Sequence, residues 1–305
     1  MDTLRLNYPV HTPDNQLLLP AGTVLSTETL EDLISSSKAT SYQTCPLLKY
    51  ENVKNDLLRQ MERPPYDLIF SRGQKIEEVM TMLEKVQMLI PVLQSLDYFK
   101  RDDYHTYCHA LMVFALSALI ARDLSPDYRE WIDIVSTGPT HDIGKICVPP
   151  HVLKKVTPLT RAERSMIDHH PVAGYILLSY FHKDPKNIAA MVARDHHERK
   201  DGSGKPRGIP LTDRMVEIIV VCDVYDALIS PRPYRPVSYD NRTAIEEITK
   251  MAETNKIGWD AVKSLVAHSR KEKTKFSEVK VSSEKRGTPP PTNFHGVVDE
   301  ADNDS

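Results

Sequence analysis

The chain lacks the features that mark secreted, disulfide-stabilised or membrane-spanning proteins. Its four cysteines are scattered without a CxxC spacing, which indicates free thiols in a reducing cytoplasm. The first residues, MDTLRLNYPVHTPD, contain neither the basic stretch nor the apolar segment of a signal peptide. The longest apolar run, residues 107–121, is shorter than the roughly 20 residues that a spanning helix needs. We therefore expect no membrane insertion.

A strong charge of one sign is also missing. The formal net charge is -3 over 305 residues, so no global basic field argues for a nucleic acid polymer as partner. Any anion site must be built from local charges. With 40% hydrophobic residues the chain can bury a sizeable core, and its length allows one large domain and a smaller one.

The N-terminal third divides into a module and a connection. Residues 1–61 open with short extended pieces and continue into a helix that Ser26 can cap, which predicts a small α/β module, regulatory or partner-docking in role. Residues 62–102 form a Pro-containing linker, near 62–74, and a connecting helix. Apolar residues with 3,4 spacing over 76–93 predict one helix that Pro91 kinks. We favour intramolecular packing of this seam, and a dimer through residues 76–93 is the alternative.

The main domain should span residues 103–270 and be mostly α, because few alternating strand-like runs interrupt its helical patterns. One helix should begin at Thr160 with a capping box. Another should have Asp184 as its cap and Pro185 at its first position. The last residues, 271–305, are charged and Pro-rich, which predicts a disordered tail.

Histidines and aspartates recur on faces that should point into this domain. His196 continues the apolar stripe of the helix before it, and its neighbour His197 lies about 100° round the same helix. His109 sits in a helix that is apolar nearly all round, so its imidazole should be buried and need a partner. Further candidates come from THDIGK, MIDHHPVAG and MVEIIVVCDVYDALIS, namely His141, Asp142, Lys145, His169, His170, Asp223 and Asp226.

Each of these residues has an ordinary structural interpretation when taken alone. His109 could be a hydrogen-bonded core histidine, and the pair at 196–197 could be a partly solvated helix end. Asp223 could be a buried structural acid. Together, inward imidazoles and carboxylates compensate one another's burial only if a cation neutralises the acids. Imidazole and carboxylate without thiolate suit iron, manganese or zinc rather than calcium.

The motif order H…HDxGK…HPxxG…HHERxDGxG…DxxDAL…RPYR resembles the HD-GYP domain of the HD phosphohydrolase superfamily. The resemblance covers roughly residues 103–268. It implies a helical bundle of the HD type and a metal-dependent phosphodiesterase that hydrolyses cyclic di-GMP in bacterial signalling. The cofactors would be two transition-metal ions, iron first, with manganese or zinc as alternatives.

The resemblance also assigns roles to residues. The first ion would be held by His109, His141, Asp142 and Asp223, and the second by Asp142 as bridge with His170, His196 and His197. Two such ions can share a hydroxide that attacks the phosphodiester. Lys145 would act with Asp142 in catalysis by holding a phosphate oxygen, and Arg232 and Arg235 would contact the dinucleotide. Asp226 would orient a ligand from behind, and His105 would touch a metal, orient a ligand in the same way or lie at the surface. His169 should be exposed.

The sequence departs from the family pattern in the loop that gives the family its name. It reads DGSGKPRGIP, with Lys205 where a tyrosine is expected. In the family this loop is associated with substrate fit and with diguanylate-cyclase-type partners. Lys205 could instead meet a substrate phosphate or be a solvated lysine. A second departure, VSTGPTHD, places Gly138 and Pro139 just before the HD pair and predicts a kink there.

Three functions remain open from the sequence. The leading hypothesis is hydrolysis of cyclic di-GMP, to the linear dinucleotide or to GMP. The second is a signalling module that keeps its metals and binds cyclic di-GMP but turns it over slowly or not at all. The third is a phosphohydrolase of another nucleotide.

Overall fold

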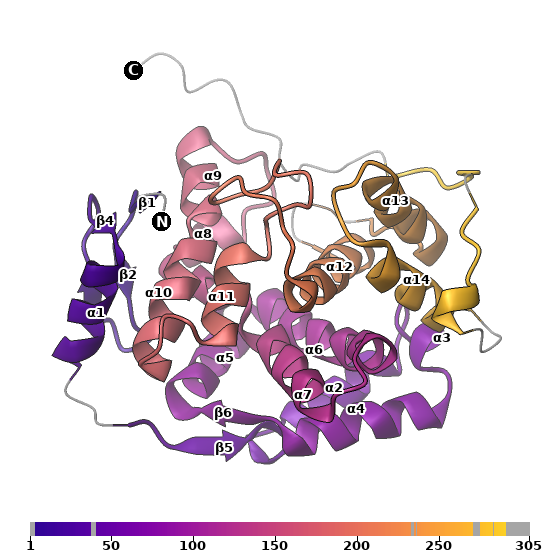
Figure 1. Ribbon diagram of the computed structural model, residues 1–305, viewed down its shortest axis with the longest axis horizontal. Helices are drawn as coiled ribbons and strands as arrows, with labels where there is room; N and C mark the ends of the chain where they lie inside the picture. The colour runs from indigo at the N-terminus through magenta and orange to yellow at the C-terminus, as the bar shows by residue number, and fades with distance from the viewer. Residues whose placement is uncertain are drawn as a thin grey trace.

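One long helix, α6 (Tyr104–Leu124), lies at the centre of the fold, with other helices around it (Figure 1). The computed structural model describes residues 4–37, 41–232, 235, 237–270, 275–282 and 284–290. α6 is long and apolar enough to cross a membrane, and 83% of its apolar window is buried inside the protein, as in a core helix. The helices that pack against it are α2 (Val53–Met61), α4 (Gly73–Lys85), α5 (Ile90–Asp102), α7 (Tyr128–Thr137), α12 (Arg214–Ile229) and α14 (Trp259–His268).

A second group of helices carries the remaining histidine motifs. α10 (His170–His182) packs against α11 (Ile188–Asp195) and against the 3₁₀ turn η3 (Ile143–Cys147). Gly144 makes the last contact close, because a Cβ there would lie 1.9 Å from the carbonyl oxygen of His170. Only glycine lets η3 and α10 approach this closely. The approach brings the HD pair beside His170. The fold is completed by η2 (Gly138–Thr140), α3 (Asp67–Phe70), α8 (Pro150–Leu153), α9 (Arg161–Asp168), α13 (Asn241–Glu253) and η4 (Phe276–Glu278).

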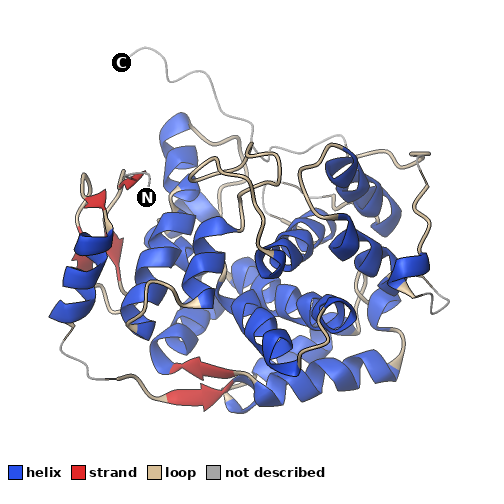
Figure 2. Cartoon of the chain, viewed as in Figure 1, coloured by secondary structure: helices blue, strands red, loops and turns tan. Residues whose placement is uncertain are grey.

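The prediction of a mostly helical bundle with a small N-terminal α/β module is confirmed (Figure 2). In the module, β1 (Leu4–Arg5) pairs with β4 (Val24–Leu25), and β2 (Val10–His11) pairs with β3 (Leu17–Leu19), both antiparallel. α1 (Thr27–Ser36) begins after Ser26, whose side chain accepts a hydrogen bond from the Thr29 N–H, as predicted. Strand β2 and helix α1 both contact α10, so the module lies against a helix that carries a histidine motif.

The predicted single helix over 76–93 is wrong. α4 ends at Lys85, and β6 (Gln87–Leu89) then pairs with β5 (Thr44–Pro46) before α5 begins. Pro91 does not kink a helix but lies in the first turn of α5, where its missing N–H costs nothing. Val79, Leu83 and Leu93 are each 0% exposed. The apolar seam thus packs within the chain, as favoured from the sequence.

Helix starts are a second place where prediction and structure can be compared. The capping box at Thr160 is present, with Glu163 closing it from the third helical position. The start predicted at Asp184 and Pro185 is wrong, because α11 begins at Ile188 and Asn187 caps it through a bond from the Ala189 N–H. The predicted break before the HD pair is observed, since α7 ends at Thr137 and gives way to η2.

The part of the predicted tail that the structure describes lies against the helical body. Val279 is 4% exposed, and the 3₁₀ turn η4 packs against α14. The backbone N–H groups of Arg286 and Gly287 donate to the Glu246 carboxylate on α13. A few apolar contacts and backbone hydrogen bonds thus hold residues 275–282 and 284–290 against the helices, although this segment has few large apolar side chains. The rest of the tail is outside the described residues.

Candidate metal centre

Three buried side chains from distant segments form a first cluster of ligand atoms. His109 comes from α6, His141 follows η2, and Asp223 lies on α12. The Nε2 of His109 lies 3.2 Å from the Nε2 of His141 and 3.1 Å from Oδ1 of Asp223. Nε2 of His141 is 3.9 Å from the same carboxylate oxygen. These three atoms could all bind one ion.

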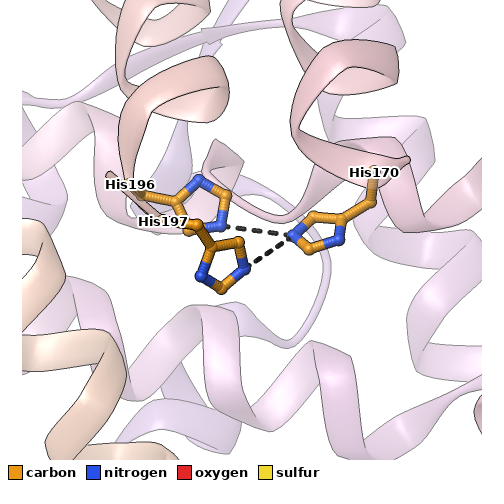
Figure 3. Close-up of side chains that lie close together, drawn as sticks. All are labelled: His170, His196 and His197. Atoms are coloured by element: carbon orange, nitrogen blue, oxygen red, sulfur yellow. Dashed lines mark hydrogen bonds between the residues drawn. The ribbon is translucent and has the colours of Figure 1, made fainter. Parts of the chain in front are cut away.

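A second cluster contains three histidines (Figure 3). His170 is the first residue of α10, and His196 and His197 follow the end of α11. Nε2 of His170 lies 3.2 Å from Nε2 of His196 and 3.2 Å from Nε2 of His197. The three rings converge on one point between the two helices, which gives three nitrogen ligands for a second ion.

Asp142 lies between the two clusters. Its Oδ2 is 3.4 Å from Nε2 of His109 and 3.5 Å from Nε2 of His141. Its Oδ1 is 3.2 Å from Nε2 of His170 and 3.8 Å from Nε2 of His196. Each carboxylate oxygen therefore faces one cluster, which is the geometry of a carboxylate that bridges two ions.

The outer nitrogens of four of these imidazoles are held by oxygen acceptors. Because a carbonyl or carboxylate oxygen can only accept, each Nδ1 must carry a proton, so the neutral form of each ring has its lone pair on Nε2. The contacts are His109 to Asp226 at 2.6 Å, His141 to the Gly138 carbonyl at 2.7 Å, His170 to the Ile167 carbonyl at 2.6 Å and His196 to the Ala193 carbonyl at 2.8 Å.

When both rings are neutral, lone pairs that face one another at 3.2 Å cannot form a hydrogen bond, and they repel unless a proton or a metal ion lies between them. The residues present therefore fit two metal ions. Neutral imidazoles and carboxylates, without thiolates, are the ligands of first-row transition metals such as iron, manganese and zinc. The outer oxygen partners are those that fix the orientation of metal-binding histidines.

The charges in the two clusters are consistent with this interpretation. Burial lowers the pKa of His196 to about 3, aided by His141 and His170, so this ring is neutral at pH 7. Although burial lowers the pKa of His109, hydrogen bonds to Asp223 and Asp226 raise it to about 9. Burial would raise the pKa of Asp142, but Lys145 and His141 hold it well below its usual range. The surroundings of the first cluster thus favour a positive charge.

Asp226 lies directly behind His109 and is 0% exposed. Its Oδ2 accepts from Nδ1 of His109, and the hydroxyl of Ser230, which donates to the main-chain carbonyl of Asp226 at 2.6 Å, lies 3.2 Å from the same oxygen. The hydroxyl of Tyr66 donates to its other oxygen, Oδ1. The carboxylate is therefore fully held by neighbours, and its placement matches the orienting role that the resemblance predicts.

A cavity of about 740 Å³ opens beside the two clusters and includes Asp142, His170, His197 and Asp223 in its wall. Lys145 also lines it and donates to Oδ2 of Asp142 at 2.6 Å. The segment is a 3₁₀ turn, so Lys145 reaches Asp142 three residues back rather than sharing a face with His141. Among the described residues that line the cavity, lysine and arginine outnumber aspartate, and they include Lys155, Arg164, Arg199, Lys205, Arg232 and Lys256.

Other predicted residues lie nearby in different settings. Arg232 and Arg235 both line the cavity, and Arg235 is 2% exposed with Nη2 bonded to the carbonyl oxygens of Ala227, Leu228 and Ser230 at the end of α12. His105 also lines the cavity and stacks on His109 with ring centroids 6.4 Å apart. The expectation that His169 is exposed is wrong. It is 8% exposed, because the ring of Tyr8 covers it at 5.8 Å.

The loop after His197 is held at both ends. Glu198 is 0% exposed, and its carboxylate accepts the N–H groups of Arg207 and Ile209. The N–H of Lys205 donates to the His197 carbonyl, and its ammonium group forms a 2.5 Å ion pair with Asp168. Lys205 thus connects the loop to the end of α9.

Several functional candidates were missed from the sequence. Tyr66 reaches Asp226 across 160 positions, and no local pattern announces such a contact. Glu198 directly follows His197 in the HHERxDGxG motif. A carboxylate at that position could have been recognised as an anchor for the loop that follows. Lys155, Arg164 and Asp168 line the cavity but sit in an amphipathic segment whose charges are typical of a solvated face.

The family profile described as an HD domain matches residues 73–260, which is more than half of the chain. The protein therefore belongs to the HD domain family. This match extends from α4 to the first residues of α14 and includes both clusters and Asp142.

The more particular likeness is to curated phosphodiesterases. The chain is 42% identical over 125 residues to the cyclic di-GMP phosphodiesterase response regulator RpfG of Xanthomonas campestris, covering 39% of this chain and 32% of the relative. It is 38% identical over 173 residues to the cyclic di-GMP phosphodiesterase PA4108 of Pseudomonas aeruginosa, covering 53% and 39%. It is 30% identical over 174 residues to the 3'3'-cGAMP-specific phosphodiesterase 1 of Vibrio cholerae, covering 56% and 38%.

The chain thus spans only about a third of the length of these relatives. Among solved structures, Bd1817 of Bdellovibrio bacteriovorus, titled an HDG"Y"P protein, matches with a TM-score of 0.46 and 15% identity, over 86% of this chain and 94% of that one. The three curated relatives are named as phosphodiesterases of cyclic dinucleotides, the class of activity that the motif resemblance implies.

Proposed function

We propose that the protein is a metal-dependent phosphodiesterase that hydrolyses cyclic di-GMP at a dinuclear centre. The observation that carries this proposal is the position of Asp142, whose two oxygens face two separate groups of imidazole Nε2 atoms. First-row ions bound there would polarise a phosphate and lower the pKa of a water molecule. The names of the relatives supply the substrate class.

The side chains of this protein have three tasks in such a reaction. The two clusters and Asp142 hold the ions, and Asp226 keeps His109 turned toward the first of them. Lys145 lies at the cavity wall with its ammonium group at Asp142, where it is placed to bind a nonbridging phosphate oxygen. The surplus of lysine and arginine in the cavity favours a dianionic ligand over a neutral one.

Further parts of the proposal concern the identity of the ions, the location of the protein in the cell and the role of the N-terminal module. We expect iron, with manganese or zinc as alternatives, since the ligands are nitrogen and carboxylate oxygen. All four cysteines are free thiols, in keeping with a cytoplasmic location. The N-terminal module, which contacts α10 and covers His169 through Tyr8, is proposed as a regulatory element. Docking of diguanylate-cyclase-type proteins and dimerisation stay predictions.

To test this, the protein is loaded anaerobically with iron(II) or with manganese and is then incubated with cyclic di-GMP. The products are separated by chromatography. We expect the linear dinucleotide or GMP to accumulate. His170→Gln should lower the rate by more than about 100-fold, since losing an outer partner of a ligand already costs 10- to 100-fold. His182→Gln is the matched control, because His182 ends the same helix that His170 begins. Absence of product with every metal would contradict the proposal.

A second candidate is hydrolysis of another cyclic dinucleotide. It is favoured by the match to a relative named a 3'3'-cGAMP-specific phosphodiesterase. Parallel incubations with cyclic di-GMP, 3'3'-cGAMP and cyclic di-AMP would identify the preferred substrate. Binding of cyclic di-GMP without turnover would instead support the signalling module that retains its metals.

A further inference from the structure

One acidic residue of the cavity is not explained by the metal clusters. The aspartates that line the cavity are Asp103, Asp142, Asp168 and Asp223. Asp142 and Asp223 face the histidines, and Asp103 caps α6 by accepting from the N–H and hydroxyl of Thr106. Asp168 holds no histidine of the clusters and caps no helix, but pairs with Arg164 and with Lys205 of the loop. It is a carboxylate in a wall that is otherwise rich in cations, which is unfavourable for an anionic ligand unless the carboxylate contacts a hydrogen-bond donor of that ligand.

The carboxylate of Asp168 is fixed through one of its oxygens. Arg164, one turn earlier in α9, donates from Nε to Oδ1 at 3.0 Å. Lys205 pairs with the same Oδ1 at 2.5 Å from the loop across the cavity. The Arg164 hydrogen bond and the ion-pair contact with Lys205 both use Oδ1, and among the described residues no hydrogen bond involves Oδ2. Since a carboxylate has about four lone-pair sites, Oδ2 keeps acceptor capacity, and the side chain is 33% exposed.

The position of this oxygen is set by the same segments that hold the second cluster. Asp168 ends α9 two residues before His170, and Lys205 is joined to His197 by its N–H. Glu198 then anchors the loop through the N–H groups of Arg207 and Ile209. A ligand phosphate bound at the clusters would therefore share the cavity with this acceptor, since Asp168, His170 and His197 all line it.

Purine bases differ in what they offer to such an acceptor. Guanine presents two adjacent donors, N1–H and the N2 amino group, whereas adenine presents an N6 amino group beside N1, which is itself an acceptor. A carboxylate therefore pairs well with guanine, and it meets a repelling lone pair at adenine N1. Resting on the proposed function, we infer that Asp168 selects guanine at one base position of a cyclic dinucleotide, with Arg164 and Lys205 as positioning residues.

The test measures binding rather than turnover. Hydrolysis-resistant phosphorothioate analogues of cyclic di-GMP and cyclic di-AMP are titrated into metal-loaded protein by calorimetry. We expect the wild type to bind the guanine analogue roughly tenfold more tightly. Asp168→Asn should weaken guanine binding by roughly tenfold, the effect of one lost base contact, and leave adenine binding within about twofold. Asp168→Glu keeps a carboxylate and should retain the preference for guanine.

The chain offers a matched control in Asp102. Like Asp168, it is the last residue of its helix and is paired with a nearby arginine, and its side chain is 32% exposed. Unlike Asp168, it does not line the cavity. Asp102→Asn should change neither affinity. Lys205→Met should lower guanine binding a few-fold and spare adenine binding. Equal losses for both analogues would assign Lys205 to phosphate and overturn its positioning role.

The outcomes separate this inference from the proposed function. If the wild type binds cyclic di-GMP but Asp168→Asn keeps the same preference, or weakens both analogues equally, Asp168 is only a surface ion-pair partner and the inference is wrong. If the wild type binds neither analogue, the proposed function fails together with it. Thermal unfolding and metal content of each variant must match the wild type, so that a folding defect is not mistaken for lost selection.

Discussion

The contact between Asp226 and His109 gives a quantitative prediction for metal binding. Asp226→Asn preserves the shape of the side chain and an oxygen that can accept from Nδ1 of His109, but it removes the negative charge. The carboxylate is 0% exposed, so water screens this charge little. Changes in the partner behind a metal-binding histidine cost about 10- to 100-fold in affinity, which corresponds to about 1.4 to 2.8 kcal/mol.

The two clusters should respond differently. An ion at the first cluster would contact His109 and should lose this affinity, whereas an ion held by His170, His196 and His197 should stay within about threefold. Tyr66→Phe removes only the hydrogen bond to the other oxygen of Asp226 and should weaken the first ion less than Asp226→Asn does. These variants therefore form a graded series.

The assay is competition with a chromophoric chelator, using zinc or manganese, together with elemental analysis of dialysed protein. Two binding steps should be resolved, and Asp226→Asn should change the metal affinity of only one of them. Unchanged affinity at both steps in a folded variant would refute the reasoning, because it would mean that the charge behind His109 does not act on the metal. Equal weakening of both steps would show that the two clusters are not separate sites.

Two further predictions concern the frame of the site. Gly144→Ala would place a Cβ 1.9 Å from the carbonyl oxygen of His170, so we expect a loss of at least about 1 to 3 kcal/mol in the free energy of unfolding and reduced metal content. Gly73→Ala, with nothing within 4 Å of the added Cβ, should be neutral when both are compared by urea unfolding and elemental analysis. Burial and the nearby His170 lower the pKa of His169 from 6.5 to about 4, so the unfolded chain binds the extra proton between these values. Stability should therefore fall as the pH drops from about 6.5 to about 4, by up to about 3 kcal/mol, and the slope should be flatter in His169→Gln. An equal slope in both proteins would contradict the assignment.

The sequence predicts the helical class and the convergence of the metal-site candidates for a clear physical reason. A histidine such as His109 in a helix that is apolar nearly all round has nowhere to point but inward, and a cation would offset the cost of burying Asp223 beside it. The order of the motifs also predicts which segments, far apart in the chain, come together at the site. The inward direction of His109 and the order of the motifs both depend on individual residues, so both predictions hold even where the predicted helix boundaries are wrong.

What the sequence does not predict depends on contacts between segments. Residues 87–89 continue a helical apolar spacing, and only their pairing with 44–46 makes them a strand. Asp184 and Asn187 are both good helix caps three residues apart, and the choice between them is made by packing. His169, predicted to be exposed, is 8% exposed because the ring of Tyr8 from the N-terminal module packs against it. Tyr66 and Asp168 likewise acquire their roles only when the chain is folded.

The central claim is that Asp142 joins two metal sites, and metal stoichiometry tests it most directly. Protein isolated gently, or reconstituted anaerobically, is analysed for iron, manganese and zinc. We predict two ions per chain in the wild type, one each in His109→Gln and His197→Gln, and a loss of both sites in Asp142→Asn. A folded wild-type protein that holds no stoichiometric ion after reconstitution, or a single ion that Asp142→Asn retains, would contradict this account.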